Sequence, residues 1–88
     1  METQELQENL EKVISNLPDF VSPYRLGKIE GNVRGRNVPT QKIYGYLKNG
    51  YIRASKNELG KYQIERSEAE RHLTKTIAKE IARIEQDS

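Results

Sequence analysis

Apolar residues recur every three or four positions through the first part of the chain. They are Leu6, Leu10, Val13, Ile14 and Leu17. This spacing places all five side chains on one face of an amphipathic helix over residues 3–16. Pro18 ends the helix, because proline cannot continue the backbone hydrogen bonding, and residues 19–21 form a connector.

A second, shorter helix is predicted next. Ser22 followed by Pro23 is a helix start, because serine caps a helix N-terminus and proline is favoured at the first helical position. Gly31 suits the left-handed conformation that often ends a helix, so we expect the helix to stop there. Residues 31–37 then form a loop, which carries two arginines.

Residues 38–40 open a third helix, which closes at Asn49 and Gly50. Ile43 and Leu47 lie one turn apart on it and face the core. A helix of about ten residues is too short to persist through propensity alone, so it must be packed against the rest of the chain.

From residue 51 the hydrophobic period changes to two. One face of the predicted strands carries Ile52, Ala54, Tyr62 and Ile64, and the opposite face carries Arg53, Ser55, Lys61 and Gln63. The segment 56–60 between the strands is polar, contains a glycine and is typical of a turn. The pattern predicts a β-hairpin with a basic outer face.

A long helix ends the chain. Residues 67–70 form a capping box, and the helix behind it runs to about residue 86. It is longer than the hairpin and the two short helices can cover, so its distal half needs another apolar surface. The N-terminal helix offers one, from the same chain or from a second copy. We favour the second copy, with a dimer interface formed by Leu6, Leu10, Leu73, Ile77, Ile81 and Ile84.

Composition narrows the class of protein. The 88 residues allow one small domain, and the absence of cysteine excludes a disulfide scaffold and a cysteine nucleophile. The single histidine, His72, excludes a histidine-rich metal site, and we assign it a structural role. No apolar run approaches the roughly 20 residues that span a bilayer, and the N-terminus lacks a secretory signal. We therefore expect a soluble intracellular protein that is not an enzyme and carries no cofactor or metal.

The net charge of +2 hides a division along the chain. Residues 1–20 carry −4, residues 21–66 carry +7 from ten bases and three acids, and residues 67–88 carry −1. A basic middle between acidic or neutral arms is typical of a core that binds a polyanion. A solvated mixed surface gives the same totals, so charge alone leaves both interpretations open.

Helix, loop, helix, hairpin and long helix in this order are typical of a winged helix-turn-helix, whose second helix enters the DNA major groove. We therefore predict a mainly α fold with a small β-hairpin. Residues 1–21 form the N-terminal helix and connector, residues 22–73 the DNA-binding domain, and residues 67–88 the C-terminal dimerisation helix. Glutamine can pair with an adenine edge, and lysine with guanine or phosphate. The candidate DNA contacts are Arg34, Arg36, Thr40, Gln41, Lys42, Tyr44, Lys48, Arg53, Lys56 and Lys61.

Residues 38–52, VPTQKIYGYLKNGYI, resemble the second-helix signature of the excisionase and MerR-type winged helix-turn-helix superfamily. That signature runs from a small polar start through Q-x-[VI]-Y and an apolar pair to K-x-G. Residues 60–64, GKYQI, resemble the family's G-x-Y-x-I return strand, and residues 65–73 resemble its third helix. Two features depart from the family: the loop 31–37 is longer than its tight turn, and Gly45 stands where arginine is frequent. The two loop arginines can compensate by reaching phosphate or the minor groove.

The resemblance implies a sequence-specific protein that binds double-stranded DNA, of phage, plasmid or other mobile-element type, in the cytoplasm with the nucleoid. It would act as a transcriptional regulator or as a recombination or partition accessory factor. As a homodimer it would contact half-sites about one DNA turn apart. MerR-type regulators carry an effector region beyond a long helix, whereas this chain stops at residue 88, so no small-molecule effector is expected. The alternative is a protein-interaction adapter that uses the winged helix and helical arms to assemble a complex.

Overall fold

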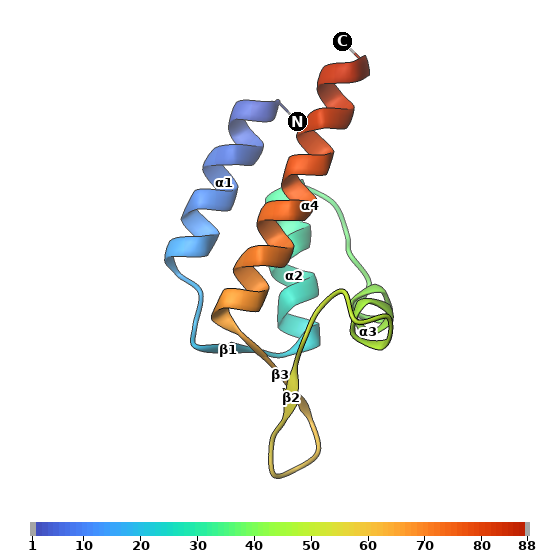
Figure 1. The fold of residues 1–88 in the computed structure, drawn as a ribbon. Helices are drawn as coiled ribbons and strands as arrows, with labels where there is room; N and C mark the ends of the chain where they lie inside the picture. Colours follow the sequence, from blue (N-terminus) through green and yellow to red (C-terminus); the bar gives the residue numbers. More distant parts are fainter. Residues whose placement is uncertain (1, 88) are drawn as a thin grey trace.

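The computed structural model describes residues 2–87 and contains four helices and three short strands (Figure 1). In chain order they are α1 (Thr3–Ser15), β1 (Phe20–Val21), α2 (Pro23–Arg34), α3 (Thr40–Lys48), β2 (Ser55–Lys56), β3 (Tyr62–Glu65) and α4 (Arg66–Asp87). The mainly helical class with a small β element is therefore confirmed. The α4 helix forms the long axis of the molecule, and α1 and α2 lie along it.

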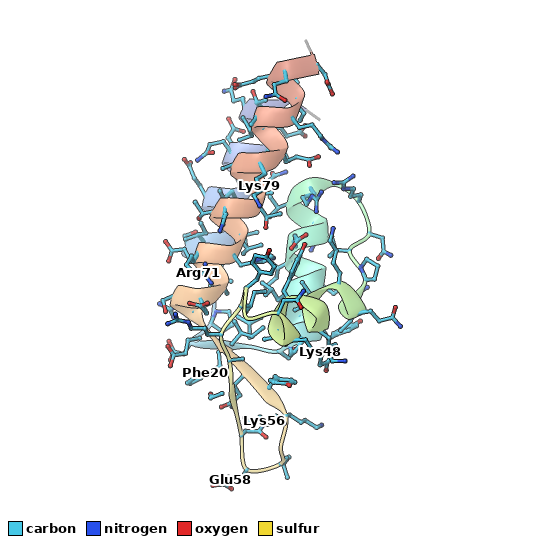
Figure 2. The ribbon with its side chains drawn as sticks, turned by 45° about the vertical axis from the view of Figure 1, so that its right-hand side comes forward. Phe20, Lys48, Lys56, Glu58, Arg71 and Lys79 are labelled. Atoms are coloured by element: carbon cyan, nitrogen blue, oxygen red, sulfur yellow. The ribbon has the colours of Figure 1, made fainter. Side chains whose placement is uncertain are left out.

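The strands form one antiparallel sheet in the order β1-β3-β2. The segment predicted as a connector contributes β1, which pairs Val21 with Ile64. The hairpin is shorter than predicted, because residues 51–54 do not form a strand. Instead, the N–H groups of Tyr51 and Ile52 donate to the Tyr46 carbonyl at the end of α3. The hairpin projects from the body of the fold, with Glu58 near its tip (Figure 2).

The α2 helix is longer than the sequence predicts. It continues through Gly31 to Arg34 and ends at Gly35, which has a φ of 71°. Gly31 serves a different purpose, since a Cβ atom at this position would lie 2.7 Å from the Arg36 carbonyl oxygen. The loop that leads to α3 thus crosses α2 too closely for any larger residue. The expectation that the helix stops at Gly31 was wrong.

The α4 helix begins at Arg66, directly after β3, and not behind a capping box at residues 67–70. The Arg66 N–H donates to the Asp19 carbonyl, which joins the start of α4 to the segment before β1. The Glu68 carboxylate accepts from the Arg53 N–H at 3.0 Å and from Arg71 Nη2 at 2.6 Å. Glu68 therefore ties residue 53 to α4 and does not close a capping box.

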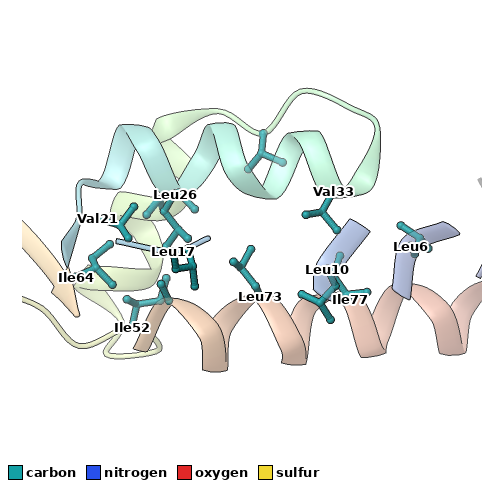
Figure 3. Close-up of a cluster of buried hydrophobic side chains, with 13 residues drawn as sticks. Leu6, Leu10, Leu17, Val21, Leu26, Val33, Ile52, Ile64, Leu73 and Ile77 are labelled. Atoms are coloured by element: carbon teal, nitrogen blue, oxygen red, sulfur yellow. The ribbon is translucent and has the colours of Figure 1, made fainter. Parts of the chain in front are cut away.

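A single hydrophobic core joins α1, α2 and α4 (Figure 3). Leu6 and Leu10 of α1 are buried in it together with Leu73 and Ile77 of α4. These four side chains pack within one chain, so their assignment to a dimer interface was wrong. Of the predicted interface residues only two, Ile81 and Ile84, are partly exposed. Dimerisation itself stays a prediction.

Candidate nucleic-acid interface

The α3 helix turns a polar strip away from the core. Its one fully buried residue, Ile43, packs toward α2, where Gly27 permits a close approach of the chain before α3. Successive residues of an α-helix are about 100° apart around the helix axis. Gln41, Gly45 and Lys48 therefore point nearly opposite to Ile43. Gln41 and Lys48 are exposed, and a Cβ atom at Gly45 would meet nothing within 4 Å beyond its chain neighbours and the backbone of α3 itself. This outward strip has room for a large partner.

One border of the outward strip faces the hairpin. The Tyr44 ring meets the Tyr62 ring of β3 edge-on, with ring centroids 6.0 Å apart. Lys56 of β2 places its ammonium 5.1 Å from the centre of the same Tyr62 ring. Tyr44 is still 44% exposed. The aromatic pair thus joins the hairpin to α3, and Lys56 lies on the hairpin side of the strip. Figure 2 labels Lys56 on the hairpin and Lys48 on α3.

The remaining predicted contacts differ in position. Thr40 is half-buried at the start of α3, while Lys61 is exposed where the hairpin turn leads into β3. Arg53 is exposed beside the start of α4. Leu59 at the hairpin turn is 80% exposed and was not singled out from the sequence.

Arg34 was assigned wrongly as a DNA contact. Because α2 extends to this residue, its side chain turns inward and is only 8% exposed. Its Nη1 atom donates to Glu30 at 2.9 Å, and its Nη2 atom donates to Glu80 at 3.2 Å. Arg36 follows in the loop and also bonds Glu80, at 3.3 Å, but its side chain stays 47% exposed. Arg36 thus remains a candidate contact, whereas Arg34 is part of the interior.

Glu30 is the centre of this interior network. It is fully buried on α2, and its Oε1 atom lies 2.6 Å from Nε2 of His72 on α4, which is also buried. Burial raises the pKa of the Glu30 carboxyl, but hydrogen bonds and charge from His72 and Arg34 outweigh it and hold that pKa below its ordinary value. His72 therefore has a structural place between α2 and α4.

A basic cleft of about 430 Å³ lies on the other border of the outward strip, between α3 and α4. Its cationic lining residues are Arg34, Lys42, Arg71, Lys75, Lys79 and Arg83, and its one acidic lining residue is Glu80. We name it the α3–α4 cleft. Figure 2 shows Arg71 and Lys79 on the α4 side of the molecule. The outward strip therefore has cations on both borders.

The sequence reasoning missed the contribution of α4 to this cleft. Four cations recur along α4 at intervals of four residues, which places them on one helix face. They are Arg71, Lys75, Lys79 and Arg83. The interval was visible in the sequence, but the net charge of residues 67–88 averaged it away.

Comparison with protein-family models, with curated proteins and with solved structures gave no match to this chain. None of the helices within residues 2–87 combines the length and apolar character that crossing a membrane requires. Over the same residues, no three histidine or acidic side chains gather in a way that could hold a metal ion.

Proposed function

We propose that the chain is a winged helix-turn-helix protein that binds double-stranded DNA, with α3 as the reading helix and the β2–β3 hairpin as the wing. The observation that carries this proposal is the outward strip of α3, which has cations on both borders. An α-helix with its side chains is about 10–12 Å across and fits a major groove about 12 Å wide. The exposed strip therefore suits insertion into that groove.

Each residue of the proposed surface has a role that follows from its chemistry. Gln41 can pair with an adenine edge, and Lys48 can contact guanine or phosphate. Gly45 lies between them without a side chain, so the α3 backbone can approach the DNA closely. Lys56 and Lys61 on the hairpin would neutralise phosphates of the flanking backbone. Transcriptional regulators and recombination or partition factors share such a surface and differ in their sites and partners.

The test substitutes Gly45, because a side chain added there meets open space and leaves the fold intact. Binding of a labelled duplex is measured by fluorescence anisotropy at about 50 and 200 mM salt. Gly45→Glu places a carboxylate against the phosphates and should lower affinity about tenfold or more. Gly45→Gln has the same size without the charge and is the matched control, while Gly45→Arg should strengthen binding. Circular dichroism confirms that all three variants fold.

Two results would contradict the proposal. If Gly45→Glu and Gly45→Gln bind the duplex equally well, α3 does not face the DNA. If the parent protein binds no duplex at low salt, the protein-interaction adapter becomes the better interpretation. A DNA-binding surface of this kind must also weaken as salt rises, because binding releases counterions from the phosphates.

A further inference from the structure

The α3–α4 cleft holds more positive charge than its acidic groups neutralise. The Glu80 carboxylate is already shared by Arg34, Arg36 and Arg83, and Arg71 pairs with Glu68. Lys42, Lys75 and Lys79 have no carboxylate partner among residues 2–87. Three like charges around one concave site repel each other, and a bound polyanion would remove that repulsion.

The same cleft contains an exposed aromatic ring on a fixed backbone. Tyr51 is 61% exposed, and its ring stands edge-on to Tyr46 with centroids 6.1 Å apart. The Tyr51 carbonyl accepts from Arg71 Nη2 at 2.6 Å, and its N–H donates to the Tyr46 carbonyl at 2.9 Å. Tyr46 in turn contacts the buried His72 ring, with centroids 5.2 Å apart. Tyr51 is therefore a supported platform on which a flat ring can stack.

We propose that the α3–α4 cleft binds one nucleotide that carries two or more phosphates. The base stacks on Tyr51, and the phosphates lie against Lys42, Lys75 and Lys79. The volume of about 430 Å³ is within the range of small-molecule sites. This site adjoins the proposed DNA surface, because its cations form one border of the outward strip. It departs from the expectation that no small-molecule effector binds.

Two features specify the ligand class. Lys75 and Lys79 are one helical turn apart, about 6 Å along α4, and Lys42 comes from the opposite wall, so the charges span more than a single phosphate. Proteins that hold single-stranded nucleic acid stack successive bases on several aromatic side chains. Within the described part of the cleft, Tyr51 is the one tyrosine with an exposed ring, which suits a single base.

The test is isothermal titration calorimetry of the full chain, without DNA, using three probes: ATP, inorganic tripolyphosphate and adenosine. ATP should bind more tightly than tripolyphosphate, and adenosine should bind weakly, because the base and the phosphates both contribute. The double variant Lys75→Gln with Lys79→Gln should lose about tenfold or more in ATP affinity. Its matched control is Lys12→Gln with Lys28→Gln, which removes the same charge from α1 and α2 outside the cleft and should bind ATP like the parent.

A second variant isolates the base. Tyr51→Leu should weaken ATP binding and leave tripolyphosphate binding unchanged. The proposal is overturned if ATP and tripolyphosphate bind equally in the parent and in Tyr51→Leu, if the control lysine pair loses as much ATP affinity as the cleft pair, or if a single-stranded oligonucleotide binds more tightly than ATP. Gly45→Glu lies outside the cleft and should keep full ATP affinity, so failure of the DNA proposal and failure of this one are distinguishable.

Discussion

Replacing Glu30 with alanine removes the carboxylate that joins α2 to α4 inside the core. One carboxylate oxygen lies 2.6 Å from His72 Nε2, and the other lies 2.9 Å from Arg34 Nη1. After the substitution, Arg34 keeps Glu80 as its one carboxylate partner among residues 2–87. Its buried Nε atom already lacks a hydrogen-bond partner within that range. The substitution therefore leaves the Arg34 guanidinium, which is 8% exposed, with one of its two carboxylate partners.

The expected cost follows from this burial. Removing one partner of a buried ion pair costs about 3–5 kcal/mol, because the remaining charge is left uncompensated. A chain of 88 residues has a total free energy of unfolding of about 4–13 kcal/mol. Each kcal/mol shifts the melting temperature of a domain of this size by about 4–8 °C. We expect Glu30→Ala to lower the melting temperature by about 12 °C or more.

Thermal unfolding at pH 7, followed by far-ultraviolet circular dichroism, measures the effect. The matched control is Glu70→Ala, which removes an exposed carboxylate from α4 and should change stability by less than about 0.5 kcal/mol. Equal melting temperatures for Glu30→Ala and Glu70→Ala would refute the reasoning. In that case the carboxylate of Glu30 would not be holding the two helices together.

Three other predictions test neighbouring features. The carboxyl pKa values of Glu30 and Glu68 are lowered in the folded chain, so the unfolded chain takes up protons first as pH falls. Stability should therefore be constant above the ordinary glutamate pKa of about 4.5 and decrease below it. A series of melting curves at different pH values measures this. In a urea titration, Gly45→Ala should raise the free energy of unfolding by about 0.5–1 kcal/mol, because helical glycine is entropically costly and a Cβ there meets open space. Gly31→Ala should lower the free energy of unfolding in the same assay, because its Cβ would meet a backbone carbonyl. Lys48→Gln should make the salt dependence of duplex binding shallower by about 0.9 in the log–log slope if Lys48 contacts phosphate; an unchanged slope would remove that contact.

The helices were predictable where their apolar stripes are long. The stripes of α1 and α4 and the Ile43–Leu47 pair of α3 all follow the helical period, and the structure has helices at these places. The end of α2 was mispredicted, because glycine serves both left-handed caps and close backbone approaches. Gly31 permits an approach and Gly35 is the cap, and the sequence alone does not separate these roles. Two residues of β1 are also too short to reveal a period of two.

The candidate site was predictable only in part. The outward position of Gln41 and Lys48 follows from the Ile43–Leu47 stripe, because the helical period places them on the other side of α3. The fate of Arg34 depended on three carboxylate and imidazole groups brought together from α2 and α4, among them Glu80, which lies 46 residues further along the chain. Such a pairing is set by the tertiary fold, and local pattern gives no sign of it. The α3–α4 cleft was missed in part for a different reason: the four-residue interval of the α4 cations is visible in the sequence, but the net charge of residues 67–88 conceals it.

The start of α1 and the end of α4 lie at the same end of the molecule, and the hairpin lies at the opposite end (Figure 1). Since the longest dimension is 47 Å, an affinity tag, a fluorescent label or a fused domain attached near either terminus would be held far from the hairpin. The protein can therefore be anchored to a sensor chip through either terminus with its hairpin directed into solution. Each terminus is equally suited to carry a further domain.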